Sequence, residues 1–329
     1  MTKNTRLRLL AAQHVEQLLD FDTALAATRE AFVLHSEGSG RVFPLVREKL
    51  AGGTFGIKSG CVEAQDLLGF KAAGSWPGNH ALGSEAHQAT ILLFDPASGR
   101  PRCVIDGNLI TTLRTGAAGG LGLLQLARPE STRLSVFGTG VQGQIQTRFA
   151  LRLLPGLKSL CYASSRGGTD AGFEAAIAAE TRGRVDVAPM TDRDAAVADS
   201  DIVITTTPGK GPLFSCDAVS PGTHLSCVGT DSAGKRELPE GLLARCRIFV
   251  DDAVQTRTIG ELQWAKGDAA PPCTTFGDLL TGKAAYSRQA DDITLFDMTG
   301  IALQDLTVAG LLWRRAEAEN IGTLVDWPW

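Results

Sequence analysis

Three glycines at a fixed spacing constrain this chain more than any other feature. Gly138, Gly140 and Gly143 follow an apolar run, 134–137, and precede a helical pattern of apolar residues. A strand, a glycine-rich turn and a helix in this order form the site that receives a dinucleotide pyrophosphate. The first glycine permits the tight turn, the second lets the backbone approach the phosphate, and the third lets the helix pack on the strand. The helix N-terminus adds free N–H groups and the positive end of a dipole. The motif therefore predicts a nucleotide site.

Strand-like and helix-like segments alternate from residue 115 onward. Strands are expected at 133–137, 157–162, 185–188, 202–206, 225–228 and 248–250, with a further one at 294–296. Alternation of this kind indicates a parallel sheet with crossover helices. The fold class is therefore α/β, with a Rossmann-type doubly wound sheet as the dinucleotide-binding domain over residues 115–293.

Residues 1–114 follow a different pattern. A helix is expected over 12–37, capped by Asp22 and Thr23 and ended by Gly38. Strands are expected within 41–60 and at 68–74, 89–94 and 101–105. This predicts an α+β unit built from antiparallel pairs, to which a long helix over 300–316 returns. The second domain is thus predicted to comprise residues 1–114 and 294–329.

Composition excludes several classes of function. The net charge is −4 and no basic stripe is present, which argues against nucleic acid as a partner. No apolar run approaches the roughly 20 residues that cross a bilayer, and the N-terminus lacks a signal-peptide pattern. The seven cysteines are scattered and never form a C-x-x-C pair, so reduced thiols are expected rather than disulfides or a metal site. A cytoplasmic protein with no membrane partner is the expectation.

Further motifs lie along the chain in a definite order. They are Gly69-Phe-Lys71, Trp76–Asn79, His87–Asp95, Asp106–Thr115, Gly229–Glu237 and Gly300–Asp305. Together with the glycine motif, they make the chain resemble the ornithine cyclodeaminase/mu-crystallin family. That family includes ornithine and lysine cyclodeaminases, an alanine dehydrogenase, ketimine reductases and iminosuccinate reductase, which exchange a hydride between nicotinamide and the Cα of an amino or imino acid. The resemblance implies a homodimer whose substrate and dimerisation domain is the N-terminal unit plus the last helix.

The resemblance also assigns roles to four residues. The family's substrate-carboxylate arginine falls on Arg47, its active-site lysine on Lys71, its second arginine on Arg114 and its catalytic aspartate on Asp231. Arginine binds a carboxylate in a bidentate manner, and a lysine nearby polarises a carboxylate or imine. An aspartate beside the reacting nitrogen gives or takes the proton that accompanies hydride transfer.

Two further residues are weaker candidates for contact with the substrate. Lys58 and His87 lie in matching segments, but a structural histidine on a strand is as consistent with the sequence as a substrate contact. Taken singly, Arg47 or Lys71 would more often be a solvated surface charge. Only their joint occurrence in matching motifs favours a site.

The end of the second Rossmann strand bears on the choice of cofactor. It reads Tyr162-Ala-Ser164-Ser165-Arg166, without the acidic residue that commonly binds the ribose 2′-hydroxyl of NAD. Serine and arginine there suit a 2′-phosphate, so NADP(H) is favoured and NAD(H) remains possible. The resemblance implies further cofactor contacts at Arg114, Thr115, Gly138, Thr139, Gly140, Val141, Gln142, Thr206, Thr207, Val228, Gly229, Thr230 and Thr299.

The segments 55–60, 74–79, 223–235 and 258–261 resemble iminosuccinate reductases more than cyclodeaminases. We therefore expect reduction of an α-imino acid, with a small imino or amino acid as the partner molecule. A cyclodeaminase, in which the hydride leaves and returns without net redox, is one alternative. A nucleotide-dependent small-molecule binding protein is another, which the intact Lys71 and Asp231 oppose.

Overall fold

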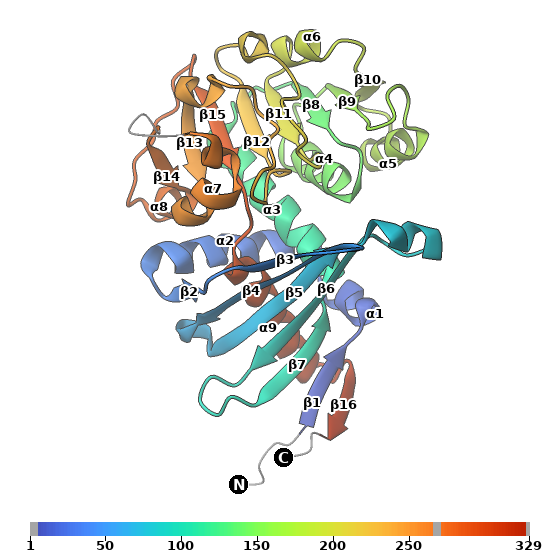
Figure 1. Ribbon diagram of the computed structural model, residues 1–329, viewed down its shortest axis with the longest axis vertical. Coiled ribbons are helices and arrows are strands. Elements are labelled where there is room, and N and C mark those ends of the chain that lie inside the picture. Colours follow the sequence, from blue (N-terminus) through green and yellow to red (C-terminus); the bar gives the residue numbers. More distant parts are fainter. Residues whose placement is uncertain (1–5, 266–270, 327–329) are drawn as a thin grey trace. The chain divides into compact units, whose positions relative to one another are not determined.

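The computed structural model describes residues 6–265 and 271–326, which form two compact units. The first unit consists of Met1–Arg114 and Ile301–Trp329, and the second of Thr115–Gly300 (Figure 1). The structure moves the second boundary from residue 294 to residue 301. The reason is that β15 (Ile293–Asp297) pairs with two strands of the second unit, β12 and β13, and so belongs to its sheet.

The second unit is built on a parallel sheet of eight strands in the order β10-β9-β8-β11-β12-β15-β13-β14. Besides β15, the strands are β8 (Arg133–Phe137), β9 (Ser159–Ala163), β10 (Asp186–Pro189), β11 (Ile202–Thr205), β12 (His224–Cys227), β13 (Cys246–Val250) and β14 (Cys273–Thr275). All neighbouring pairs are parallel, which confirms the Rossmann-type prediction. The short edge strand β14 was not predicted.

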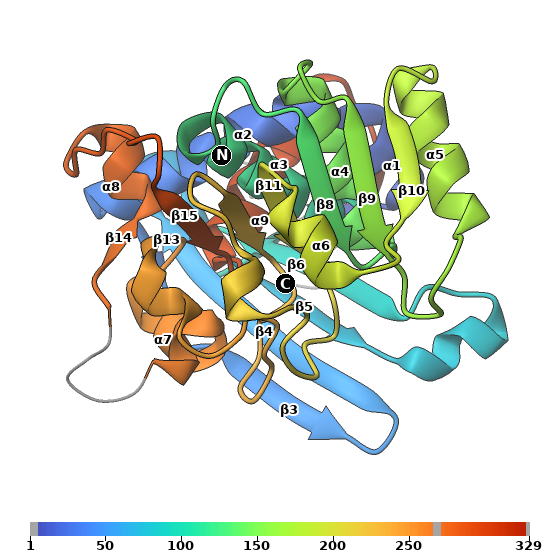
Figure 2. The same cartoon turned by 90° about the horizontal axis from the view of Figure 1, so that it is seen from above.

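Helices cover both faces of this sheet, as the alternation of apolar side chains along its strands requires. In β11, Ile202 and Ile204 join a core with residues of α3, α4 and α5, whereas Val203 joins a second core with Val197 of α6. Figure 2 shows α4 and α5 on one side of β8 and β9 and α6 on the other. The helices are α3 (Asn108–Leu126), α4 (Val141–Leu153), α5 (Ala171–Thr181), α6 (Arg193–Ala198), α7 (Ala253–Ile259) and α8 (Phe276–Thr281).

The first unit contains a mixed sheet in the order β16-β1-β7-β6-β5-β4-β2, with β3 paired to β4. Its strands are β1 (Arg6–Leu10), β2 (Gly40–Val42), β3 (Val46–Leu50), β4 (Gly53–Val62), β5 (Leu67–Ser75), β6 (His87–Phe94), β7 (Pro101–Asp106) and β16 (Thr323–Asp326). The antiparallel pairs were predicted. The edge strands β1 and β16 were not, and β1 pairs in parallel with β7.

Two helices replace the single one expected over residues 12–37, and that prediction was wrong. They are α1 (Ala12–Leu18) and α2 (Phe21–Glu37). The chain is extended at Asp20, whose carboxylate accepts a hydrogen bond from the Thr23 backbone N–H at 2.8 Å. Asp20 is therefore the N-cap, in place of Asp22 and Thr23. Gly38 ends α2 in the left-handed conformation, as predicted.

The last long helix, α9 (Ala302–Ala318), packs against β4, β5 and β6 and against α2 (Figure 1). Glycine in the sheet permits this close approach, since a Cβ at Gly69 would lie 3.0 Å from the Leu306 side chain. The N-terminal end of α9 thereby delivers polar residues to one face of the sheet.

Three negative observations apply to the described part of the chain. None of its helices has the length and apolar character needed to cross a bilayer. No group of His, Cys, Asp or Glu side chains in it is arranged to hold a metal ion. The seven cysteines are free thiols.

Candidate active site

The glycine-rich turn after β8 has the geometry that its three glycines predict. Gly138 has a φ of 103°, which favours glycine. A Cβ at Gly143 would lie 1.9 Å from the carbonyl oxygen of Gly138, so only glycine permits this packing. At Gly140, by contrast, nothing lies within 4 Å of where a Cβ would be. The first and third glycines thus serve the fold, and the second leaves free space beside the backbone.

The turn lies where the strand order reverses, between β8 and β11, which is where open α/β sheets bind ligands. Thr206, after β11, donates to the Phe137 carbonyl from both its amide, at 2.8 Å, and its hydroxyl, at 3.0 Å. The first turn of α4 presents N–H groups that have no acceptor within the helix. Oε1 of Gln142 is buried and has no hydrogen-bond partner among the described residues. The free N–H groups of α4 fit a bound pyrophosphate, whereas the Gln142 oxygen is an acceptor and suits a donor such as a ribose hydroxyl.

The strand β9 ends before Ser164, Ser165 and Arg166, as predicted, and the last two are exposed. Asp170, at this edge of the sheet, was not predicted as a site residue. Its carboxylate caps α5 and accepts a hydrogen bond from the Thr139 hydroxyl at 2.7 Å. This bond, together with that from the Phe173 amide, holds the pKa of Asp170 below its usual value. An ionised carboxylate therefore contacts the glycine-rich turn.

Asp231 lies in the loop after β12, also within the second unit. Its Oδ1 is 2.7 Å from Nζ of Lys235, and its side chain is 38% exposed. The buried Thr230 hydroxyl donates to Glu261 at 2.5 Å. The Gly229 amide donates to Glu237 at 3.1 Å. Of the other predicted cofactor residues, Thr207 also donates its amide to Glu237, Val228 donates to the Thr205 carbonyl, and Thr299 donates to Asp251.

Lys71 and Arg114 meet at a single buried carboxylate in the first unit. Lys71 is 3% exposed, and its Nζ donates to Oδ1 of Asp305 at 2.8 Å and to the Thr111 hydroxyl at 3.2 Å. Nε of Arg114 donates to the same oxygen at 3.0 Å, and its Nη1 donates to Gln304 at 3.1 Å. Burial, followed by the Arg114 charge, lowers the pKa of Lys71 to about 7, although Asp305 opposes the shift.

Asp305 is the residue of this cluster for which no role was predicted. Burial opposes its ionisation, but the charges of Arg114 and Lys71 hold its pKa below the usual value. Its second oxygen, Oδ2, has no hydrogen-bond partner among the described residues. The motif that ends in Asp305 was visible in the sequence, yet nothing local indicated that a residue more than 200 positions from Lys71 would contact it.

The sheet register places four of the predicted residues on one face. Arg47 pairs with Gly56 and Lys58 with Lys71, while Ser75 pairs with His87. Paired residues share a face, as do residues two apart on a strand, so the side chains of Arg47, Lys58, Lys71 and His87 lie on the same side. The row that begins at Arg47 continues through Gly56, Ala73 and Ala89. None of these three carries more than a methyl group, so the row adds little side-chain bulk to this face.

These four residues differ in how closely the structure brings them to the buried cluster. The charge of Lys58 contributes to lowering the pKa of Lys71. Partial desolvation, and then the charges of Lys71 and Arg114, lower the pKa of His87, although its side chain keeps access to solvent. Arg47 is exposed on β3. Thr115 begins the second unit and is buried, and its carbonyl accepts a hydrogen bond from Gln146.

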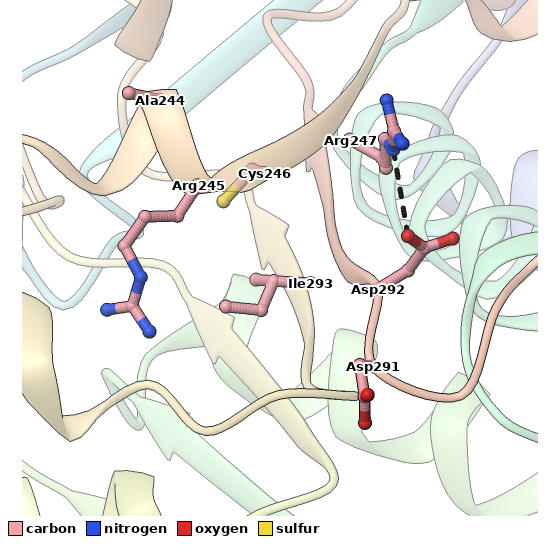
Figure 3. A pocket seen from close by; sticks show the side chains of 7 residues that line it. All are labelled: Ala244, Arg245, Cys246, Arg247, Asp291, Asp292 and Ile293. Carbon is pink, nitrogen blue, oxygen red and sulfur yellow. Dashed lines mark ion pairs between the residues drawn. The ribbon is translucent and has the colours of Figure 1, made fainter.

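A cavity of about 230 Å³ lies on the second unit (Figure 3). Its lining includes Arg245, Arg247 and Asp292, and Arg247 pairs with Asp292 at 3.6 Å. It also includes Cys246 and Ile293, which begin β13 and β15. The cavity therefore lies at the N-terminal edge of the sheet, opposite the glycine-rich turn.

A Rossmann-type unit joined to an α+β unit with a buried lysine–aspartate–arginine cluster defines a class of two-unit nucleotide-binding proteins. Sequence comparison makes this more specific. The chain matches the ornithine cyclodeaminase/mu-crystallin family over residues 6–320, and it belongs to that family.

Two characterised relatives match almost the whole chain. Alanine dehydrogenase of Archaeoglobus fulgidus is 31% identical, over 96% of this chain and 97% of that protein. Iminosuccinate reductase of Paracoccus denitrificans is 30% identical, over 97% of this chain and 99% of that protein.

Solved structures show the same fold. An archaeal alanine dehydrogenase dimer with bound NAD superposes with a TM-score of 0.89 at 28% identity, covering 98% of this chain and 100% of that one. Iminosuccinate reductase of Paracoccus denitrificans in complex with NAD⁺ superposes with a TM-score of 0.87 at 29% identity, covering 98% of this chain and 99% of that one. The match extends over both units of the chain.

Proposed function

We propose that this protein is an NAD(P)H-dependent reductase that converts an α-imino acid to the amino acid, with iminosuccinate as the preferred substrate. The observation that carries the proposal is the buried cluster of Lys71, Asp305 and Arg114 on a sheet face that also bears Arg47 and Lys58. Relatives of about 30% identity that are named iminosuccinate reductase and alanine dehydrogenase support it.

The cations of the first unit suit a substrate with more than one carboxylate. Arg114 is held by Asp305 and Gln304 and keeps guanidinium N–H groups for a bidentate contact. Arg47 is the second candidate arginine for a substrate carboxylate. Lys58 and His87 are candidates for contact with the distal carboxylate. The small residues Gly56 and Ala73 beside them suit a compact substrate.

Lys71 and Asp231 are assigned to proton transfer and to polarisation of the substrate. With a pKa of about 7, Lys71 exchanges protons readily at neutral pH and polarises the carboxylate or imine of the substrate. Asp231 gives the proton to the imine nitrogen, or takes it in the reverse direction. A nicotinamide held at this site would supply a hydride for the imine carbon, and with one proton on nitrogen this would convert C=N to CH–NH.

The glycine-rich turn and the residues at the ends of β9, β11 and β12 would hold the dinucleotide. We favour NADP(H), because Ser164, Ser165 and Arg166 follow β9 without an acidic residue. Asp170 opposes this preference, since its carboxylate is ionised beside the turn. The test is to measure KM for NADH and NADPH with the wild type and with Arg166→Ala. We expect the substitution to raise KM for NADPH roughly tenfold and to change KM for NADH little. A clear preference of the wild type for NADH would overturn the assignment.

We also propose that the chain forms a homodimer through its first unit, since the archaeal alanine dehydrogenase was solved as a dimer. Light scattering of the purified protein at micromolar concentration measures this directly. A monomeric mass would contradict it.

A substrate screen tests the activity itself. NAD(P)H absorbance is followed with iminosuccinate, cyclic ketimines, pyruvate plus amines, and ornithine. Stoichiometric oxidation of the nucleotide with iminosuccinate is expected. Release of ammonia from ornithine without net oxidation would instead show a cyclodeaminase, and binding without turnover would show a binding protein.

Asp231→Asn tests the mechanism. Because the amide cannot exchange the proton, kcat should fall by about 10² to 10³, while the Kd for the nucleotide stays within about twofold. Asp66→Asn, at an exposed position of the first unit, is the control. Unchanged turnover in Asp231→Asn would remove this aspartate from the mechanism.

A further inference from the structure

Asp231 is held by a lysine from its own loop. Nζ of Lys235 lies 2.7 Å from Oδ1 of Asp231, four residues earlier, and donates a second hydrogen bond to the Gly229 carbonyl at 3.2 Å. One ammonium group therefore bridges the backbone before Thr230 and the carboxylate after it. The segment Gly229–Asp231 is closed into a ring by this side chain.

Lys235 is itself fixed from the other side by the short 3₁₀ helix Glu261–Trp264. Its carbonyl accepts a hydrogen bond from Nε1 of Trp264 at 2.7 Å and another from Nε2 of Gln263 at 3.3 Å. Gln263 also accepts the Gly234 amide at 2.7 Å through Oε1. The lysine backbone is thus anchored by two side chains, which limits where its ammonium can reach.

The base of the loop is anchored by buried carboxylates. Oε1 of Glu261 accepts both the Thr230 hydroxyl, at 2.5 Å, and the Glu237 amide, at 2.7 Å. The Glu237 carboxylate in turn accepts the amides of Gly229 and Thr207. A loop with this many internal bonds holds Asp231 in a narrow range of positions, which is what a proton-transferring group requires.

We propose that Lys235 is a positioning residue that holds the Asp231 carboxylate in a single orientation for the substrate nitrogen and favours its ionised form, which accepts the proton when the amino acid is oxidised. The inference rests on the proposed function, because it assigns Asp231 to the reacting nitrogen. An ammonium in contact favours the charged form of a carboxylate. The Lys235 and Asp231 side chains are 33% and 38% exposed, so solvent screens the effect and its size is moderate.

The other charges near the pair must be considered in any pH measurement. Among the described residues of the loop and of the segments packed against it, they include Arg236, Glu237, Lys210 and Glu261. Arg236 is engaged with the Trp264 ring, and Glu237 and Glu261 are buried and directed at backbone amides. Among the described residues, Lys235 is a charged group that contacts Asp231 directly.

The test is the pH profile of kcat for Lys235→Met in the full-length protein, measured in the direction of amino-acid oxidation, where Asp231 accepts the proton, with the amino acid that corresponds to the imine identified by the screen. Methionine keeps the aliphatic length and removes the charge. We expect kcat at the optimum to fall about 5- to 20-fold and the acidic limb of the profile to move up by roughly 0.5 to 1 pH unit. KM for the nucleotide should change less than about twofold. Lys235→Arg keeps the charge and should restore kcat to within about threefold of wild type.

Lys158→Met is the matched control, since Lys158 is an exposed lysine of the same unit at the N-terminal edge of its sheet. Its profile should equal that of the wild type. An unmoved acidic limb in Lys235→Met, with a wild-type melting temperature, would overturn the proposal. Equal losses in the Met and Arg variants would also overturn it, because packing rather than charge would then be responsible. A wild type that turns over no imine contradicts the proposed function instead, so the two failures are distinguishable.

Discussion

The two units bury charge of opposite sign, each beside residues assigned to the reaction. In the first unit, Lys71 and Arg114 share the carboxylate of Asp305. In the second, the carboxylates of Glu237 and Glu261 are satisfied by backbone amides and threonine hydroxyls. The first arrangement depends on an ion pair between distant segments, and the second depends on local backbone geometry.

Burial opposes the charged form of a side chain whatever its sign. The stability of the fold nevertheless depends on pH in opposite ways for a buried lysine and a buried glutamate. Burial lowers the pKa of Lys71 to about 7, so its contribution makes the fold more stable as pH rises from 7 toward 10.5. Burial raises the pKa of Glu261 to about 7, so its contribution is present below 4.5 and is lost as pH rises to 7. Near neutral pH both contributions are at their weakest. The comparison is tested by removing one charge at a time.

The largest effect is expected from Asp305→Asn. The substitution leaves Lys71 and Arg114 buried without their shared anion, and breaking a buried pair in this way costs about 3–5 kcal/mol of unfolding free energy. Urea denaturation at pH 6, where Lys71 is protonated, measures the loss. Asp66→Asn is the control, because Asp66 pairs with Arg102 at the surface and its loss should cost less than about 1 kcal/mol. Equal losses in both variants would contradict a special role for the buried cluster.

A smaller effect on the unfolding free energy is expected from Glu261→Gln, and its dependence on pH is opposite to that of the buried lysine. The amide keeps an oxygen for Thr230 and for the Glu237 amide but does not titrate. The wild type should therefore lose up to about 3 kcal/mol relative to the variant between pH 4.5 and pH 7, which urea denaturation at both values measures.

Asp201→Asn is the matched control for that measurement. Asp201 is a buried carboxylate of the same unit whose pKa is lowered, despite burial, by the backbone amides of Thr132 and Arg133. Its titration lies below pH 3.8, so the substitution should change stability equally at pH 5 and pH 7. If the Glu261→Gln difference is also independent of pH, Glu261 is ionised throughout and the comparison between the units fails.

Local patterns in the sequence were sufficient for much of the second unit. The glycine spacing and the alternation of apolar segments gave the turn, the helix α4 and most of the parallel strands, because a strand buried on both faces is apolar along its length. The cap of α2 shows the limit of such patterns. Asp20 and Asp22 have the same capping chemistry, and only the extended backbone at Asp20 distinguishes them.

Contacts between distant segments were not predictable in the same way. The edge strand β16 pairs with β1, joining Arg6 to Asp326, and neither short segment shows a strand pattern that excludes a loop. Asp305 contacts Lys71 only because α9 packs on β5. Glu261 was seen as part of a motif, but its burial and its bond to Thr230 depend on the packing of a 3₁₀ helix on the loop. Resemblance to a family supplied the candidate residues for the reaction, whereas the structure identified the groups that contact them.

The smallest effect is expected from Lys58→Met, which refines the account of the buried lysine. Lys58 pairs with Lys71 across β4 and β5, and its positive charge helps to lower the pKa of Lys71. Because Lys58 is only half-buried, solvent screens the interaction, so the substitution should raise the pKa of Lys71 by a few tenths of a unit. The basic limb of the kcat/KM profile should move to higher pH by the same amount. Lys49→Met, at an exposed position on β3, should leave the limb unchanged. An unmoved limb together with a raised KM for the imine would show that Lys58 acts as a substrate ligand and not through the charge of Lys71.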